Sequence, residues 1–338
     1  MTVRTLIVDD SASMRALIAR TLSNDPAIEV VGAAEDPFQA REMIKTLDPD
    51  VITLDVEMPG MNGLDFLDRI MRLRPMPVVM LSTLTQAGAA ATIEALEIGA
   101  FDCCAKPAHG QLDPALVETV KAAGTSRRRQ PRRTANSPTG TPPADYTPRP
   151  DTLIALGAST GGVEALIELL SGFPANCPPT VVVQHMPGTF TGSFAARLDR
   201  LTPPHVSEAR SGERLQAGHV YLAPGGTHHL EVRGSNHWYC RLVPDDPVSG
   251  HRPSVDRLFA SVAQTCGSKA VGAILTGMGR DGATGLKAMR NAGSFTVGQD
   301  QATSTVYGMP CVAFEIGAVE QQLPLSRIAR PLLDRCRA

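Results

Sequence analysis

The chain has 338 residues, of which 43% are hydrophobic and only 4% aromatic, with 30 glycines and 27 prolines. This is the composition of a globular chain long enough for two domains, and the shortage of aromatic residues argues against a surface that stacks on the bases of single-stranded nucleic acid. The net charge of −2 divides into −9 over residues 1–120, +6 over residues 121–150 and +1 over residues 151–338. The charge pattern therefore predicts an acidic block, a basic connector and a nearly neutral block.

Cysteine spacing and the apolar runs exclude several other classes of protein. The seven cysteines include no C-x-x-C pair, so we expect neither a structural zinc site nor a disulfide framework. The segment MTVRTLIVDD carries acidic residues directly after its apolar run, unlike a secretory signal peptide. No apolar run approaches the roughly 18 residues of a membrane-spanning helix. We expect a cytoplasmic protein that does not insert into a membrane.

Residues 1–122 alternate short apolar runs with amphipathic helical patterns. The expected strands are Arg4–Val8, Glu29–Ala33, Val51–Leu54, Pro77–Leu81 and Phe101–Ala105. Five strand–helix units of this kind predict a flavodoxin-like α/β domain, in which helices cover both faces of a parallel sheet.

Reactive residues stand at the ends of these expected strands. Asp9 and Asp10 end the first, Asp55 the third, Ser82 the fourth and Lys106 the fifth. The carboxyl ends of parallel strands share one edge of the sheet, so these side chains should converge. Three carboxylates in one pocket repel each other, and a divalent cation such as Mg²⁺ relieves that repulsion. Asp55 would then accept a phosphoryl group, with Lys106 neutralising its oxygens and the Ser82 hydroxyl bonding the new group.

This combination resembles the receiver domain of two-component response regulators, through the segments IVDDS, LDVEMPGMNG, VVMLS and CAKP. The resemblance implies phosphoryl transfer from a partner histidine kinase to Asp55. It also implies Mg²⁺ held by Asp10, Asp55 and the backbone carbonyl of Glu57, with Asp9 in the same acidic pocket. Receivers usually carry tyrosine or phenylalanine three residues before the lysine, and Cys103 occupies that position here. The usual aromatic coupling between the phosphorylated site and the surface is therefore not expected.

Residues 123–150 are expected to form a flexible linker. They are rich in proline, threonine, serine and arginine and almost free of aliphatic side chains, which is typical of an unstructured segment. The basic run RRRQPRR lies in this linker and not on a folded element, so we interpret it as solvated chain and not as a nucleic-acid site. Contact with the acidic first domain is the alternative.

Residues 151–338 predict a second α/β domain, with a doubly wound parallel sheet and a small β-hairpin insertion. The expected strands are Thr152–Gly157, Thr180–Gln184 and Ala270–Thr276. The expected helices are Gly162–Ser171, Phe190–Leu201, Val255–Thr265 and Thr284–Asn291. The intervening runs His219–Ala223, His229–Val232 and Tyr239–Val243 predict short strands or a hairpin.

The first strand of this block runs into the segment GASTGG, with Ser159 at its centre, and then into a helix. A G-x-S-x-G segment between a strand and a helix is the arrangement of a nucleophile elbow. The start of the helix supplies free N–H groups, and the N–H of Thr160 is the natural donor to an oxyanion. A phosphate-binding loop at the same place is the alternative, although the segment lacks the lysine of a P-loop and the spacing of G-x-G-x-x-G.

A nucleophilic serine needs a base and an acid that orients the base. His185 ends the strand that follows, and its strand-end position favours it over His228 and His229. Asp281 stands where the strand AVGAILT leads into another helix, and Asp300 ends a later strand. Spacing alone leaves both choices open.

The segments GASTGG, VVVQHMP, YLAPGGTHH, PSVDRLF and ILTGMGRDG resemble the catalytic domain of the chemotaxis protein-glutamate methylesterases, over about residues 151–338. The resemblance implies that Ser159, His185 and Asp281 are catalytic. The N–H groups of Thr160 and Met278 would stabilise the oxyanion. The implied reactions are hydrolysis of glutamate methyl esters and deamidation of specific glutamines on chemoreceptors, with no cofactor in this domain.

Together, the two resemblances imply a serine hydrolase of chemotaxis signalling that is activated when a histidine kinase phosphorylates Asp55. The unphosphorylated receiver would block the catalytic cleft, and we expect a monomer. The rival interpretation is a receiver fused to a DNA-binding domain. The neutral charge of residues 151–338 and the lack of a helix-turn-helix unit argue against it, so we expect no nucleic-acid partner.

Overall fold

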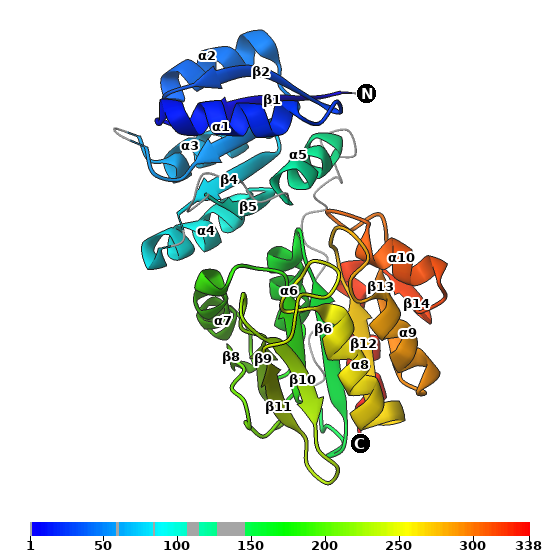
Figure 1. Ribbon diagram of the computed structural model, residues 1–338. Helices are drawn as coiled ribbons and strands as arrows, with labels where there is room; N and C mark the ends of the chain where they lie inside the picture. The colour runs from blue at the N-terminus through cyan, green and yellow to red at the C-terminus, as the bar shows by residue number, and fades with distance from the viewer. Residues whose placement is uncertain (1, 59–60, 84, 107–114, 127–145) are drawn as a thin grey trace. The chain divides into compact units, whose positions relative to one another are not determined.

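The computed structural model describes residues 2–58, 61–83, 85–106, 115–126 and 146–338, and the chain divides into two compact units, residues 1–132 and 133–338 (Figure 1). Each unit has its own sheet. Within the described ranges, no helix combines the length and the apolar character needed to cross a lipid bilayer.

The first unit contains a parallel five-stranded sheet, as its alternating pattern predicts. Its strands lie in the order β2-β1-β3-β4-β5. They are β1 (Val3–Val8), β2 (Ile28–Ala34), β3 (Val51–Asp55), β4 (Val78–Ser82) and β5 (Asp102–Ala105). Every residue of β3 and β4 is buried, which explains why these strands are continuous apolar runs and not alternating ones.

Five helices follow the strands of this unit: α1 (Ala12–Ser23), α2 (Pro37–Leu47), α3 (Gly63–Leu73), α4 (Gln86–Ile98) and α5 (Ala115–Ser126). Side chains cap the starts of several of them. The hydroxyl of Ser11 accepts from the Met14 N–H at 3.4 Å at the start of α1, and Asp36 caps α2 in the same way. Apolar residues of α1 and α5, among them Ile18 and Val120, pack on one face of the sheet.

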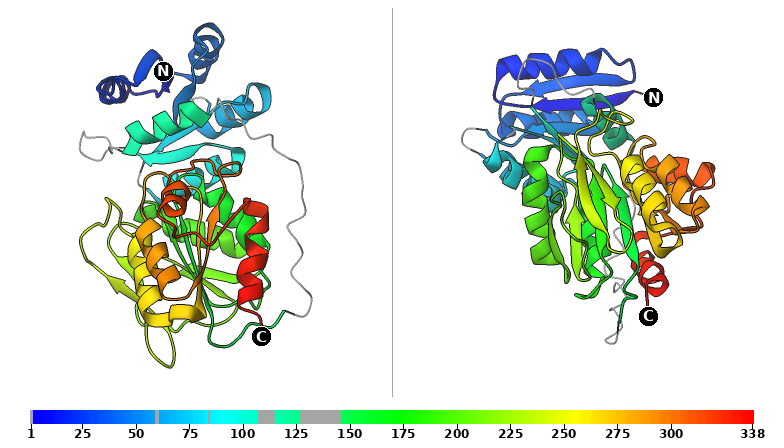
Figure 2. Two further views of the ribbon diagram at one scale, coloured as in Figure 1. Left: turned by 90° about the vertical axis from the view of Figure 1, so that its right-hand side faces the viewer. Right: turned by 60° about the horizontal axis from the view of Figure 1, so that its bottom comes forward.

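The second unit is built on a parallel seven-stranded sheet in the order β14-β13-β12-β6-β7-β9-β8. Its strands are β6 (Leu153–Ala158), β7 (Thr180–Gln184), β8 (His205–Glu208), β9 (His219–Leu222), β12 (Ala270–Ile274), β13 (Phe295–Gln299) and β14 (Gln321–Leu323). Its helices are α6 (Gly162–Ser171), α7 (Gly188–Leu201), α8 (Val255–Cys266), α9 (Ala283–Asn291), α10 (Met309–Glu315) and α11 (Ala329–Arg335). Helix α7 lies on one face of the sheet, and α8 and α9 lie on the other (Figure 2).

The β-rich middle of this unit differs in part from the prediction. Strand β9 belongs to the main sheet, between β7 and β8, and β8 itself was not predicted. Only β10 (His229–Arg233) and β11 (Tyr239–Val243) form a separate antiparallel hairpin. Leu230 and Val232 of this hairpin share a buried core with Leu258 and Phe259 of α8. The hairpin therefore adds an apolar layer over α8.

The central strands of the second sheet bring the predicted reactive positions together. Strand β6 lies between β7 and β12. Ala158 at the end of β6 pairs with Gln184 at the end of β7, and Gly157 pairs with Ile274 at the end of β12. The residues that directly follow these three strand ends therefore lie at one edge of the sheet.

Both ends of the expected linker are ordered. Helix α5 continues to Ser126, beyond the boundary expected at residue 122. At the other end, Tyr146 is 4% exposed and donates its hydroxyl proton to the Leu333 carbonyl at 3.0 Å. The Asn176 side chain donates to the Tyr146 carbonyl at 2.7 Å. The basic run at residues 127–133 lies outside the described residues.

Replacing Tyr146 by phenylalanine should destabilise the second unit by about 1 kcal/mol, because the Leu333 carbonyl loses the buried hydroxyl donor and keeps only the Cys336 N–H. Urea unfolding of the full chain should show a lower midpoint for this unit alone. Tyr239→Phe, at a position 41% exposed, is the matched control and should change nothing. An unchanged midpoint for Tyr146→Phe would contradict the anchoring of this segment.

Candidate functional site

The predicted acidic pocket of the first unit is assembled around Lys106. Asp9 and Asp55 are buried, whereas Asp10 is exposed. The Lys106 ammonium lies 2.9 Å from Asp9 Oδ2 and 2.6 Å from Asp55 Oδ2. Ligand atoms of Asp9, Asp10 and Asp55 all lie within 4.8 Å of one another. The strand-end residues therefore meet as the sequence predicts.

Burial leaves the Asp55 carboxylate incompletely compensated. Burial and the nearby Asp9 charge raise the pKa of Asp55 to about 6, although Lys106 acts in the opposite direction. Burial alone would lower the pKa of Lys106, but its contacts with Asp55 and Asp9 outweigh burial, and the pKa lies above the ordinary value. The pocket thus holds two buried carboxylates, and the Lys106 ammonium is the positive charge that both of them contact.

The donor set of this pocket fits Mg²⁺. Three carboxylates within ligand distance of one another are the oxygen ligands that this cation prefers. The N–H of Glu57 donates to Asp55 Oδ1 at 3.2 Å, which places the Glu57 backbone beside the acceptor residue. Ligation by the Glu57 carbonyl stays a prediction.

The side chains of Ser82 and Cys103 both donate to backbone carbonyls of α4. The Ser82 hydroxyl is buried at the end of β4 and donates to the Gly88 carbonyl at 3.1 Å. The Cys103 thiol donates to the Thr92 carbonyl at 3.6 Å, and burial raises the pKa of this thiol. The residue at the usual aromatic position is therefore a small, neutral side chain that packs on α4.

The Ser159 turn in the second unit is fixed by its backbone. The Ser159 N–H donates to the Thr276 carbonyl at 3.0 Å, and the Ser159 carbonyl accepts from Gly162 N–H at 2.7 Å and from the Gln184 side chain at 2.8 Å. Gly161 has a φ of +75°, which an L side chain rarely adopts. A Cβ on Gly277 would lie 2.7 Å from Ser159 Cβ. Glycine at both positions lets the serine occupy a tight strand-to-helix turn.

His185 and Asp281 are in direct contact. His185 Nε2 lies 2.8 Å from Asp281 Oδ2, and both side chains are almost completely buried. Because a carboxylate only accepts, Nε2 carries the proton and Nδ1 has the lone pair. Nδ1 is buried and has no hydrogen-bond partner among the described residues, and no hydrogen bond joins His185 to Ser159. The free ring nitrogen is thus the only one available as a base.

The Asp281 carboxylate is held by the first turn of α8. It accepts from the Ser254 hydroxyl at 2.8 Å, the Val255 N–H at 2.7 Å and the Asp256 N–H at 3.1 Å. Burial would raise the pKa of Asp281, but these bonds and the His185 contact outweigh it, and the pKa lies below the ordinary value. Asp281 is therefore ionised at neutral pH.

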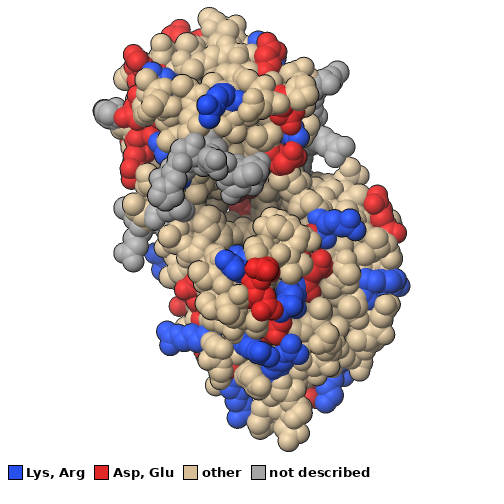
Figure 3. Space-filling view, viewed as in Figure 1, with Lys and Arg blue, Asp and Glu red and all other residues tan. Residues whose placement is uncertain are grey.

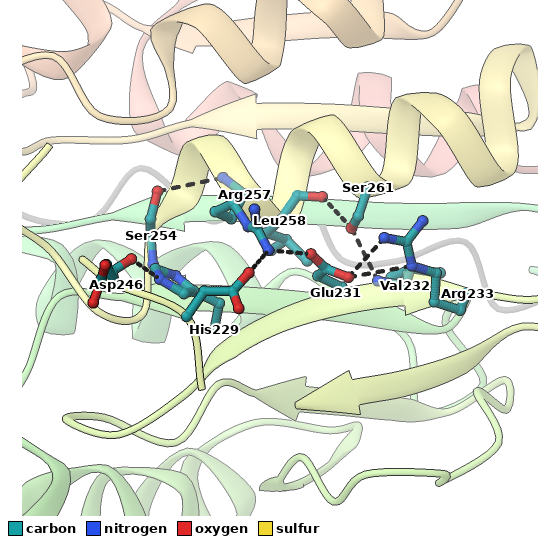
Figure 4. A network of polar contacts seen from close by, with 10 residues as sticks. His229, Glu231, Val232, Arg233, Asp246, Ser254, Arg257, Leu258 and Ser261 are labelled. Atoms are coloured by element: carbon teal, nitrogen blue, oxygen red, sulfur yellow. Dashed lines mark hydrogen bonds and ion pairs between the residues drawn. The ribbon is translucent and has the colours of Figure 1, made fainter. Parts of the chain in front are cut away.

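The rival residues from the sequence have other partners. His229 is fully buried in β10, where Nδ1 accepts from the Ser254 N–H at 3.1 Å and Nε2 donates to the Asp246 carbonyl at 2.9 Å (Figure 4). His228 contacts the Thr227 hydroxyl at 2.8 Å. Asp300 accepts from the N–H and hydroxyl of Thr303, within its own turn. His229 therefore supports the site indirectly, through Ser254.

Two residues that the sequence analysis did not single out belong to this site. Ser254 caps α8 and bonds Asp281. The ring of His251 stacks on His185, with centroids 3.8 Å apart and an interplanar angle of 9°. Ser254 stands directly before the expected helix, where a capping serine could have been recognised. His251 lies in a loop without periodicity, so no sequence signal pointed to it.

Two backbone N–H groups close to Ser159 in the chain or through Gly277 could serve as donors. Those of Thr160 and Met278 have no acceptor in the part of the chain that the structure describes. Thr160 follows the serine, and Met278 lies next to Gly277, which packs on Ser159. Such free donors suit an oxyanion.

On the face drawn in Figure 3, the lysines and arginines of the second unit are interspersed with acidic residues and form no continuous basic surface.

Comparisons with known proteins found relatives of both units. The family model described as CheB methylesterase matches residues 154–332, and that of the response regulator receiver domain matches residues 5–117. The protein-glutamate methylesterase/protein-glutamine glutaminase 1 of Caulobacter vibrioides is 60% identical, over 98% of this chain and 97% of its own. The Agrobacterium fabrum protein-glutamate methylesterase/protein-glutamine glutaminase is 57% identical, over 98% and 95%. The crystal structure of the Thermotoga maritima CheB methylesterase catalytic domain is 37% identical, with a TM-score of 0.53, and the match covers 54% of this chain and 97% of that one.

The raised pKa of Asp55 can be measured directly. In the absence of Mg²⁺, the side-chain carboxyl should titrate with a midpoint near pH 6, and Mg²⁺ should lower the midpoint because a cation favours the charged form. The measurement is a ¹³C NMR pH titration of aspartate-labelled full chain, with the resonance assigned by its loss in Asp55→Asn. Sodium chloride at equal ionic strength is the control for screening. A midpoint near that of ordinary aspartate, or one insensitive to Mg²⁺, would contradict this description of the pocket.

Proposed function

Because this chain belongs to the family of CheB protein-glutamate methylesterases, we propose that Ser159, His185 and Asp281 are its catalytic triad and Asp55 its phosphoacceptor. The chain is a receiver-regulated hydrolase that removes methyl esters from glutamates of chemoreceptors and deamidates glutamines, which gives adaptation in chemotaxis. The observation that supports the triad best is the 2.8 Å contact between His185 and an ionised Asp281. His185 follows the end of β7, which pairs with the end of β6 directly before Ser159.

The first half-reaction forms an acyl-enzyme. Asp281 keeps the proton of His185 on Nε2, so Nδ1 takes the proton from the Ser159 hydroxyl as Oγ attacks the ester carbonyl. The tetrahedral oxyanion is stabilised by the N–H groups of Thr160 and Met278. When the carbonyl re-forms, the alkoxide leaves with the proton from Nδ1 as methanol, and the glutamyl carbonyl stays bonded to Ser159.

The second half-reaction releases the product. Water attacks the acyl carbonyl while His185 Nδ1 takes its proton, and the returned proton restores the Ser159 hydroxyl. The receptor side chain leaves as a glutamate carboxylate. A glutamine follows the same course, except that its first leaving group is ammonia. All groups needed for both steps lie at the ends of β6, β7 and β12 or in the loops that follow them.

We propose that the phosphoryl donor is the histidine kinase of a chemotaxis system. Asp9, Asp10 and Asp55 would hold Mg²⁺, which when bound neutralises phosphoryl oxygens. Lys106 pairs with Asp55 and supplies a second positive charge to those oxygens. The Ser82 hydroxyl, which bonds the Gly88 carbonyl in the unphosphorylated pocket, would exchange that bond for one to the phosphoryl group. The motion would be transmitted to α4.

The substrates we propose are the cytoplasmic helices of methyl-accepting chemoreceptors, and the active species is a monomer. Modification of side chains on a helical bundle requires an accessible nucleophile. Ser159 is partly exposed, which agrees with this requirement.

Ser159→Ala should lower methanol release from methylated receptor membranes by about 10³-fold or more, because no other group can form the acyl-enzyme. Ser268→Ala, at an exposed serine in the same unit, should leave the rate unchanged. Gas chromatography of released methanol measures both. Undiminished release by Ser159→Ala would refute the assignment of the nucleophile.

Asp55→Asn should abolish the increase in esterase rate that a small phosphodonor such as acetyl phosphate produces with Mg²⁺, since an amide cannot accept the phosphoryl group. The readout is the ratio of methanol release with and without donor. Asp65→Asn, which alters an exposed carboxylate in the first turn of α3, should keep the wild-type ratio. If Asp55→Asn responded like the wild type, control by this residue would be disproved.

A further inference from the structure

The loop between β11 and α8 folds back on itself just before Ser254 and the start of α8. Val248 and His251 exchange two backbone hydrogen bonds, of 3.0 and 2.9 Å. The two residues between them, Ser249 and Gly250, have φ of +52° and +81°. Positive φ at both central positions is the signature of a tight two-residue turn. The turn reverses the chain and directs His251 toward the sheet edge, where its ring stacks on that of His185.

The loop that carries His251 is anchored on both sides. Arg252 donates from Nε to the Gly226 carbonyl at 2.9 Å and from Nη1 to the Asp245 carbonyl at 3.1 Å. His229 bonds the Asp246 carbonyl before the turn and the Ser254 N–H after it (Figure 4). These contacts join the loop to β10 and to the residues that follow β9. The position of His251 is therefore fixed independently of His185.

A single hydrogen bond to Asp281 does not define the plane of the His185 ring. With Cβ held by the backbone and Nε2 held by the carboxylate, the ring can still tilt about the line through these two atoms. That tilt moves Nδ1, which lies off the line, through an arc. A parallel ring 3.8 Å away blocks the tilt toward its own side. The stacked ring thus supplies the constraint that Asp281 lacks.

We propose that His251 is a positioning residue, whose ring restricts the tilt of the His185 imidazole so that Nδ1 can take the proton of the Ser159 hydroxyl. The inference rests on the proposed function of His185 as the base. It assigns His251 no proton transfer, so a flat ring of another chemistry should serve. Because the geometry of the base affects the chemical step and not substrate docking, the effect should fall on kcat and not on KM.

The test compares His251→Ala with His251→Phe in the full chain, in the presence of phosphodonor. His251→Ala should lower kcat for methanol release by about 10- to 100-fold with KM within about threefold of wild type, since small misplacements of a catalytic group have effects of this size. His251→Phe retains a flat ring and should stay within about threefold of wild type in kcat. His237→Ala, at the exposed tip of the β10–β11 hairpin, is the control and should match wild type.

Three results would overturn the inference. They are a kcat of His251→Ala within about threefold of wild type, a loss shared equally by the phenylalanine variant, and a defect confined to KM. Thermal unfolding of each variant distinguishes a local effect from misfolding. If His251→Ala unfolds early, His251→Leu, which fills the space without a flat ring, takes its place, and a kcat within about threefold of wild type for that variant would overturn the inference. His185→Ala tests the proposed function separately, because full activity of that variant would refute the role of His185 as the base.

Discussion

The hydrogen bond between His185 and Asp281 is the contact around which the candidate site of the second domain is arranged. An ionised carboxylate buried in protein is costly unless donors compensate it. Asp281 has four: His185, the Ser254 hydroxyl and the N–H groups of Val255 and Asp256. Three of them belong to the start of α8, which therefore stabilises the charge and also sets the direction of the carboxylate. The β10–β11 hairpin packs on α8 and, through His229, on its capping residue, so an insertion far from β6 in sequence maintains the histidine beside Ser159.

The receiver domain places a buried aspartate in the opposite electrostatic situation. Asp281 has enough donors to lower its pKa, whereas Asp55 shares one lysine with Asp9 and has its pKa raised to about 6. A structural carboxylate is stabilised in its charged form. Asp55, the proposed phosphoacceptor, is left short of positive charge, which favours binding of a cation. In the proposed function, the same residue type thus orients a histidine in one domain and accepts a phosphoryl group in the other.

Much of both sites could be predicted because a parallel sheet converts strand ends into neighbours. Asp9, Asp55 and Lys106 meet for this reason, and so do the segments that contain Ser159 and His185. The strand-end position favoured His185 over His229, but sequence spacing alone did not settle the choice. Their difference lies in long-range partners, which for His229 are Ser254 and Asp246. Strand β8 was missed because its sequence HVSE has one apolar residue, and His251 was missed because it lies in an aperiodic loop.

The use of Nε2 by Asp281 has a mechanical consequence. In the proposed mechanism the base is Nδ1, the ring nitrogen bonded directly to Cγ, which lies nearer the main chain than Nε2. Nδ1 is only two bonds from Cβ, so a displacement of the His185 backbone reaches the proton acceptor almost undiminished, whereas the stacked His251 ring limits the tilt of the imidazole. The His185 N–H is bonded to the Ala158 carbonyl, one residue before the nucleophile. The base and the serine are thus carried on the same pair of strands, and a distortion of that pair would move both together.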